Sequence, residues 1–202
     1  MKKLPLIALA SLWFSPVHAE EIDFDFKDPK GVNMVSFHLD SPLEPFGGFG
    51  YNIAGTLGFD PENPKATSGS IELPTKSIVT SNPKMTEHLH GEKWLNAAKN
   101  PTVSFTIDKV TKAEKTGDNA WALSVNGSFK LAGVTKPLTT TVNVSYIPDG
   151  VAKRGGGKVG DLLVVRSDFT LKRSDFGIMP GQSLEKVAEK INVKVGITGY
   201  GI

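Results

Sequence analysis

The sequence predicts an all-β fold of eight antiparallel strands, either closed into a barrel or packed as a sandwich. Apolar and polar residues alternate over most of the chain. A period of two places one face of each strand in a core and the other face in water. Eight such runs are joined by short connections rich in turn residues, so consecutive strands are expected to pair antiparallel. Strands of this number and spacing are typical of a barrel or a sandwich.

Each run carries its apolar side chains at every second position. In order along the chain these residues are Val35, Phe37 and Leu39; Ile53, Leu57 and Phe59; Ile71 and Leu73; Val103, Phe105 and Ile107; Trp121, Leu123, Val125, Phe129 and Leu131; Leu138, Val142, Val144 and Tyr146; Val165, Phe169 and Leu171; and Ile191, Val193, Val195 and Ile197. Turn residues separate the runs at residues 60–64, 116–119 and 132–137, where proline, asparagine and glycine favour chain reversal. The basic loop at residues 153–158 lacks the hydroxyl residue and the helix that follow a phosphate-binding lysine, and we interpret it as a linker.

Two stretches interrupt the alternation and predict helices. Residues 82–99 begin with Asn82 or Ser81 as N-cap and Pro83 at the first helical position, which is the usual start of a helix. Residues 184–191 predict a short second helix that is capped by Ser183.

The N-terminus predicts export to the periplasm of a bacterium. Lys2 and Lys3 precede an apolar stretch at residues 4–14, and Val17 and Ala19 fit a small-residue cleavage site. We therefore expect residues 1–19 to be a signal peptide that is cleaved after Ala19, and residues 20–202 to be one β-barrel domain. The apolar stretch is too short to cross a hydrocarbon core of about 30 Å, so no membrane span is expected.

Composition excludes several classes of protein. The chain contains no cysteine, which excludes disulfide scaffolds, thiol chemistry and cysteine-anchored lipoproteins. The signal peptide would remove two of the 23 basic residues and none of the 21 acidic ones, leaving a neutral mature chain. A neutral chain is a poor candidate for binding nucleic acid or an acidic membrane surface.

Reactive side chains do not gather into a recognisable catalytic or metal-binding motif. No G-x-S-x-G nucleophile motif is present, and His88 and His90 have only Glu87 and Glu92 as neighbouring ligands, which is poorer than usual metal-site spacing. Residues 175–177 (DFG) match a kinase tripeptide without the rest of its signature. We interpret them as a charged rim residue, a buried ring and a glycine turn. The sequence thus predicts a binding protein, not an enzyme, without a bound metal.

Aromatic rings are spread over nearly every run, next to several glycines. These residues include Phe37, Phe46, Phe49, Tyr51, Phe59, Phe105, Phe129, Phe169 and Phe176, with Gly47, Gly48, Gly50, Gly55 and Gly58 close by. In a sandwich the rings would form an ordinary core. The interior of an eight-stranded barrel just holds its side chains or one slender ligand, and the glycines would either leave room for it or permit strand bends.

Three segments of the chain, in the same order, resemble the YceI-like, polyisoprenoid-binding family. Residues 88–105 (HLHGEKWLNAAKNPTVSF) are similar to its H-L-x-s-x-d-F-[LF]-d-x-x-x-y-P-x-i-x-F segment. Residues 127–138 (GSFKLAGVTKPL) are similar to G-x-L-t-[IL]-x-G-v-T-k-P-v, and residues 173–178 (RSDFGI) to R-x-d-F-G-[IL]. Three features depart from the family pattern. Residues 28–32 lack a His-Ser pair, residues 41–48 replace a stretch in which a histidine precedes a glycine-rich turn, and Lys93 stands where aspartate is usual.

The resemblance implies an extended eight-stranded antiparallel, lipocalin-like barrel with a helix capping one end. It implies a tunnel that binds a long isoprenoid or similar amphiphile, such as a quinone tail, a polyprenyl phosphate or a fatty amide. A bound isoprenoid or quinone would be the ligand, and no other cofactor is expected. The family has no established catalytic role and includes homodimers.

We predict an apolar tunnel lining with a polar group of residues at one end. The predicted lining is Phe49, Ile53, Phe59, Ile71, Trp94, Phe105, Leu123, Phe129 and Phe176. The predicted head-group residues are His88, Arg173 and Asp175, because guanidinium forks onto phosphate and imidazole donates to a quinone or diphosphate oxygen.

Two other functions remain open on the sequence alone. One is a secreted, stress-related interaction module whose barrel is filled by its own side chains. The other is an enzyme of isoprenoid-quinone metabolism, which would require two titrating groups that face each other inside the tunnel.

Overall fold

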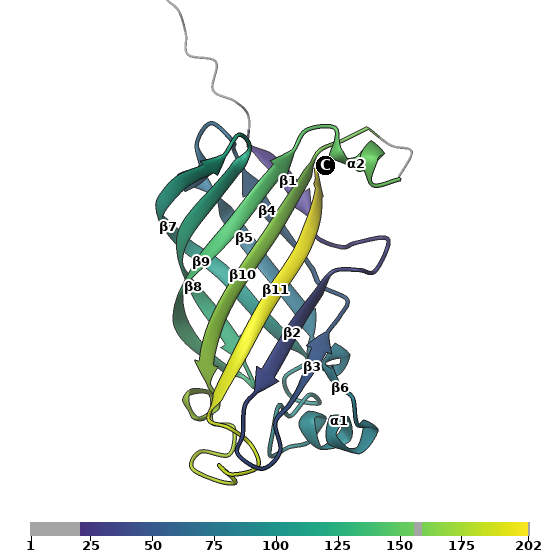
Figure 1. Ribbon diagram of the computed structural model, residues 1–202, viewed down its shortest axis with the longest axis vertical. Coiled ribbons are helices and arrows are strands. Elements are labelled where there is room, and N and C mark those ends of the chain that lie inside the picture. The colour runs from purple at the N-terminus through teal and green to yellow at the C-terminus, as the bar shows by residue number, and fades with distance from the viewer. Residues whose placement is uncertain (1–20, 156–158, 202) are drawn as a thin grey trace, which may run out of the picture.

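A computed structural model describes residues 21–155 and 159–201 as a tall barrel (Figure 1). The predicted signal peptide, residues 1–19, lies outside the described residues. Eleven strand segments form one antiparallel sheet. They are β1 (Ile22–Asp25), β2 (Met34–Leu39), β3 (Phe46–Gly50), β4 (Ala54–Phe59), β5 (Ser68–Pro74), β6 (Val79–Thr80), β7 (Thr102–Gly117), β8 (Ala120–Leu131), β9 (Val134–Ile147), β10 (Leu162–Lys172) and β11 (Lys190–Gly201).

Eight of these segments close into a ring. Its order is β1-β4-β5-β7-β8-β9-β10-β11, and β11 pairs back onto β1. The other three segments continue the sheet. Strand β2 pairs with β11, as β1 does; β3 pairs with β2, and β6 pairs with β3. The predicted all-β barrel of eight antiparallel strands is therefore confirmed.

Asn33 bridges the break between β1 and β2. Its side chain is 5% exposed, and its amide nitrogen donates to the carbonyl oxygens of Phe26 and Thr198 at 3.0 Å each. Its amide oxygen accepts from the Thr198 nitrogen at 2.8 Å. One side chain thereby satisfies buried backbone groups that strand pairing leaves open where residues 26–33 leave the sheet.

Two of the glycines allow β4 and β5 to approach each other closely. Gly55 has φ +124°, and a Cβ atom there would lie 2.2 Å from the Ser70 carbonyl oxygen. Gly69 has φ +116°, and a Cβ atom would lie 2.2 Å from the Thr56 carbonyl oxygen. Gly55 therefore serves the backbone of the wall and does not make room for a ligand.

A helix lies at one end of the barrel, but it is shorter than predicted. Helix α1 spans Pro83–His90, and the Asn82 side chain caps it by accepting from the nitrogens of Lys84 (2.9 Å) and Met85 (3.2 Å). The predicted continuation to residue 99 is wrong, because Gly91 ends the helix and Asn96 has φ +46°. Helix α2, Gly150–Lys153, lies at the opposite end beside the chain's C-terminus (Figure 1) and was not predicted.

Aromatic rings fill the half of the barrel nearer α2. Phe24 and Phe59 are fully buried. The Phe59 ring packs edge-on against Trp121, with centroids 5.4 Å apart, and Phe24 and Phe59 both pack near Tyr146 at 6.3 and 6.4 Å. Burial and a hydrogen bond from the Tyr146 hydroxyl to Asp161 (2.6 Å) raise the pKa of Tyr146 to about 12. This half of the interior is therefore a closed core.

An ion pair fastens α2 to the barrel at the same end. Arg154 donates from both terminal nitrogens to the two Asp28 oxygens at 3.2 Å, and its guanidinium lies 5.2 Å from the centre of the Tyr200 ring. The Asp28 side chain is 2% exposed. Burial alone would raise the pKa of Asp28. Hydrogen bonds from the amides of Val32 and Lys30 and from the Tyr200 hydroxyl, with the charge of Arg154, outweigh burial and lower it.

The lowered pKa of Asp28 predicts an acid-dependent loss of stability. Asp28→Asn should lower the free energy of unfolding by about 2 kcal/mol at pH 7, because it leaves Arg154 without its charged partner. The folded pKa lies below the unfolded value of about 3.9, so this contribution is present above pH 4 and is lost as the pH falls through the folded pKa. Urea denaturation of both proteins between pH 7 and pH 3 measures the difference. A difference that stays constant over that range would contradict the account, and Asp118→Asn, at an exposed turn, is the control.

Candidate ligand-binding cavity

A cavity of about 220 Å³ lies inside the barrel, in the half nearer α1. Its wall consists of inward side chains at every second strand position, which pair across neighbouring strands, for example Val35 with Val195 and Phe37 with Val193. The apolar side chains that line it are Val35, Phe37, Leu39, Phe46, Ile53, Leu57, Ile71, Leu73, Ile78, Leu89, Trp94, Leu95, Val103, Phe105, Ile107, Phe129, Leu131, Leu138, Val142, Val165, Phe169, Leu171, Ile178, Val187, Ile191, Val193, Val195 and Ile197.

Very little of this wall is polar. Thr140 and Ser167 face each other across β9 and β10, with their hydroxyl oxygens 3.0 Å apart, and Ser167 also donates to the Thr141 carbonyl oxygen at 2.8 Å. Glu72 and Ser104 also border the cavity. They are paired with each other and alternate with inward Leu73 and Phe105, so their side chains point outward. A ligand in this cavity would therefore meet almost only hydrocarbon.

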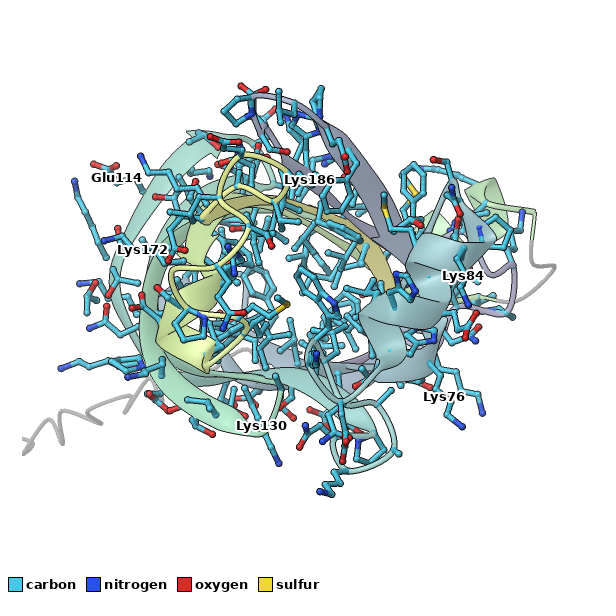
Figure 2. All side chains as sticks on the ribbon, turned by 90° about the horizontal axis from the view of Figure 1, so that it is seen from below. Lys76, Lys84, Glu114, Lys130, Lys172 and Lys186 are labelled. Atoms are coloured by element: carbon cyan, nitrogen blue, oxygen red, sulfur yellow. The ribbon has the colours of Figure 1, made fainter. Side chains whose placement is uncertain are left out.

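The segments at the α1 end separate the cavity from solvent. They contribute Leu89 on α1, Trp94 after it, and Ile178 and Val187 from the β10–β11 connection. Figure 2 shows this end from below, with α1 on one side of the barrel and the yellow-green connection of residues 173–189 on the other. Because rings fill the other half of the barrel, a ligand that enters along the barrel axis must pass between these segments.

Five of the nine predicted lining residues lie around this cavity: Ile53, Ile71, Trp94, Phe105 and Phe129. Phe59 and Leu123 lie in the filled half, 0% and 1% exposed. Phe176 packs edge-on against Phe129, at 5.7 Å between ring centres, and lies behind the wall.

Phe49 lies on the outside of the barrel, and its predicted place in the lining is corrected. It is 42% exposed and contacts Tyr51, with ring centres 6.3 Å apart. In β3 the inward positions are Phe46, Gly48 and Gly50, which pair with inward residues of β2. The Phe37 ring occupies the space beside Gly48, since a Cβ atom there would lie 2.6 Å from that ring. The sequence gives no alternation of apolar residues in this glycine-rich strand that would have placed Phe49 on the outer face.

Arg173 is buried and engaged, so its predicted role in binding a phosphate is corrected. It is 1% exposed and donates to the carbonyl oxygens of Ala188 (3.2 Å), Ile178 (2.9 Å) and Val187 (3.3 Å), and also of Met179 and Gln182. A guanidinium has five N–H donors, and these five bonds use all of them. Arg173 organises the β10–β11 connection and has no donor left for a ligand.

The predicted helix at residues 184–191 is absent. Residues 183–187 form only one turn, in which Lys186 and Val187 donate to the Ser183 carbonyl oxygen, and β11 begins at Lys190. Carbonyl groups that a helix would use internally accept from other partners: that of Glu185 from the Leu43 nitrogen, that of Lys186 from the Ser41 hydroxyl and that of Val187 from Arg173. The local helix propensity therefore yields to tertiary hydrogen bonds.

The other two predicted head-group residues point to solvent. His88 is exposed on α1, and Asp175 is exposed in the short helical turn η3 (Arg173–Phe176). Neither residue borders the cavity. The structure does not bring His88, Arg173 and Asp175 together into one polar site.

Sequence reasoning missed most of the wall, although the signal was present. Val193, Val195, Val35 and Phe169 alternate in the predicted strands and line the cavity. They were assigned to the core because alternation identifies an inward face but does not reveal which part of the interior is empty.

Residues 21–155 and 159–201 contain no group of three or more His, Asp or Glu side chains arranged to hold a metal ion. Within the same ranges, no helix has the length and apolar character needed to span a membrane.

Residues 28–199 match the family model described as a YceI-like domain. The chain belongs to the YceI-like family. Protein YceI of Escherichia coli O17:K52:H18 is 30% identical over 204 residues, covering 98% of each chain. A UPF0312 protein of Pseudomonas aeruginosa is 28% identical over 201 residues, covering 98% of this chain and 97% of its own. The family resemblance predicted from three segments is confirmed.

Two solved structures share the fold of this family member. Burkholderia cenocepacia BcnA aligns with a TM-score of 0.65 at 18% identity, covering 82% of this chain and 95% of its own. A polyisoprenoid binding domain from Saccharophagus degradans aligns with a TM-score of 0.61 at 11% identity, covering 91% and 99%. Likenesses at such low identity concern the fold alone.

The five hydrogen bonds of Arg173 predict that its substitution lowers the free energy of unfolding. Arg173→Lys should lower the free energy of unfolding by about 3 kcal/mol, because three ammonium donors cannot satisfy five carbonyl groups. For a chain of this size that loss lowers Tm by about 6–12 °C. Arg166→Ala, on the outer face of β10, is the control and should stay within about 0.5 kcal/mol of wild type. Equal melting curves for Arg173→Lys and wild type would contradict the structural role.

Proposed function

We propose that this protein is a periplasmic carrier that holds the apolar chain of an isoprenoid or similar amphiphile in the cavity. The observation that carries the proposal is the composition of the wall, in which Thr140 and Ser167 are the main polar side chains and are bonded to each other. The polyisoprenoid-binding description of a structural neighbour with the same fold adds support.

The size of the cavity supports a slender ligand that is only partly enclosed. Its volume of about 220 Å³ exceeds the engineered apolar cavity of about 150 Å³ that binds benzene, but it is below the range of about 300–1,000 Å³ for drug-sized ligands. About ten buried methylene groups would contribute about 8 kcal/mol, against an association cost of about 4 kcal/mol or more. Micromolar binding therefore requires further contacts, which a longer chain would make with Trp94 and Val187 at the α1 end.

The geometry supports one orientation of the proposed ligand. Because Phe59 and Trp121 fill the α2 half, the apolar tail would point toward that core and the head group toward the α1 end. Arg173 has no free donor there, so the head group would be solvated or bound by other residues.

Both alternatives have less support than a carrier. An enzyme would need two titrating side chains facing each other in the cavity, whereas the inward polar groups of the described wall are two hydroxyls and the engaged Arg173. A module filled by its own side chains fits the α2 half but leaves the cavity without a use.

A matched pair of substitutions on β9 tests the position of the ligand. Val142 lines the cavity and Thr141 beside it is exposed on the outer face. Val142→Phe should reduce the affinity for parinaric acid, a fluorescent polyene fatty acid, by about tenfold or more, because the ring occupies the ligand's space. Its melting temperature should change little, since an empty cavity accepts added bulk.

Fluorescence titration and circular dichroism of wild type, Val142→Phe and Thr141→Phe measure both properties. Thr141→Phe should bind as wild type does. The cavity is not the binding site if Val142→Phe retains full affinity while remaining folded.

The periplasmic location has its own test. If Val17 and Ala19 direct cleavage as proposed, protein recovered from the periplasm should begin at Glu20. Mass mapping of the N-terminal peptide determines this, and an intact Met1 in that fraction would contradict the proposal.

A further inference from the structure

Two exposed leucines project from the α1 end of the barrel. Leu43, between β2 and β3, is 62% exposed, and Leu184, between β10 and β11, is 48% exposed. The two loops are joined, because the Leu43 nitrogen donates to the Glu185 carbonyl oxygen at 2.9 Å and the Ser41 hydroxyl donates to the Lys186 carbonyl oxygen at 2.9 Å. The two leucines therefore lie on one projection, which is formed by two loops that are hydrogen-bonded to each other.

Lysines lie around the α1 end of the barrel. Figure 2 labels Lys76, Lys84, Lys130, Lys172 and Lys186 on several sides of the barrel as seen from this end. They come from helix α1, the ends of strands β8 and β10, and two connections, and closure of the barrel brings them to one end.

The charge of the described chain is divided between its two ends. Residues 40–45, 75–101, 130–136 and 172–190, at the α1 end, contain ten basic and seven acidic residues. Residues 21–30, 60–68, 115–120, 147–155 and 159–161, at the α2 end, contain six basic and nine acidic residues. The neutrality of the whole chain therefore conceals a basic end and an acidic end.

Among the described residues of the α1 end, ion pairing leaves the excess of three positive charges unchanged but concentrates it in six unpaired lysines against three unpaired carboxylates. Four of its seven carboxylates lie within 4.0 Å of a basic group, in the pairs Glu44–Lys186, Glu87–Lys84, Glu92–Lys99 and Glu189–Arg173. Among the described residues, six of its lysines have no carboxylate within that distance: Lys76, Lys93, Lys130, Lys136, Lys172 and Lys190. Only Asp40, Asp175 and Glu185 are left to oppose them.

We propose that the α1 end is a docking surface for an anionic lipid bilayer. Leu43 and Leu184 would enter the interface between head groups and acyl chains, while the unpaired lysines would lie over lipid phosphates. Exposed apolar side chains combined with basic residues are the composition that binds such surfaces. The docking stands on this surface alone and does not require that the cavity holds a ligand. If both hold, an apolar chain passes between bilayer and cavity without crossing water.

The exposed aromatic pair Phe49 and Tyr51 is a rival surface on the side of the barrel. Its neighbours along the adjacent groove are Ser36, His38, Gly47, Asn192 and Lys194, and Lys194 is paired with Asp168 at 3.6 Å. That surface lacks the unpaired positive charge that an anionic bilayer would attract, so we assign the docking to the α1 end.

Co-sedimentation with vesicles tests the proposal. Wild type should bind vesicles of phosphatidylcholine mixed with phosphatidylglycerol, bind much less to phosphatidylcholine alone, and be released by high salt, which screens exposed charges. The triple variant Lys130→Gln, Lys172→Gln, Lys190→Gln should bind about 100-fold more weakly, since each lysine contributes about fivefold at such a surface. The pair Leu43→Ser, Leu184→Ser should also lose binding.

Matched variants at the α2 end are the controls. Lys65→Gln, Lys115→Gln, Lys153→Gln removes three exposed lysines there, and Val159→Ser removes an apolar side chain that is 89% exposed. Both should bind vesicles as wild type does. All variants should retain parinaric acid binding in solution, which separates a docking defect from a defect of the cavity. Equal binding to both kinds of vesicle, or loss of binding in the α2-end variants or in Phe49→Ser instead, would overturn the proposal.

Discussion

Closure of eight strands into one ring sets the volume that side chains must fill, and the rest of the structure depends on how they fill it. Such an interior just holds side chains or one slender ligand. In one half, the rings of Phe24, Phe59 and Trp121 fill the space. In the other half, mainly aliphatic side chains leave a cavity of about 220 Å³. The interior of the barrel is thus a filled core in one half and an apolar cavity in the other.

One of the segments that cover the α1 end, the β10–β11 connection, depends on a buried charge. Arg173 holds the β10–β11 connection through its five donors, and that connection carries Ile178 and Val187 into the cavity wall and Leu184 outward. The same segment therefore forms part of the wall, the cover and the proposed bilayer contact. Within the family-like segment at residues 173–178, Arg173 therefore has an architectural role, while Ile178 borders the cavity.

The sequence predicted the barrel well because alternation is a local signal, and it predicted the site only in part. Phe105 and Phe129 were placed correctly on inward faces. Phe49 was not, because the glycines on both sides of it have no side chains that would show which face of the strand is apolar. The role of Arg173 could not be read from its motif, since its acceptors are carbonyl groups whose positions depend on the folded connection. The net charge is a sum over the whole chain. It therefore could not show that folding brings unpaired lysines together at one end.

Native mass spectrometry of the protein purified from its source organism tests the central claim, that the cavity holds an apolar chain. The account predicts a population carrying one amphiphile of defined mass per chain, which organic extraction removes and which added polyprenyl lipid restores. A clean mass of the chain alone, unchanged after incubation with polyprenyl lipid and with fatty acid, would contradict it.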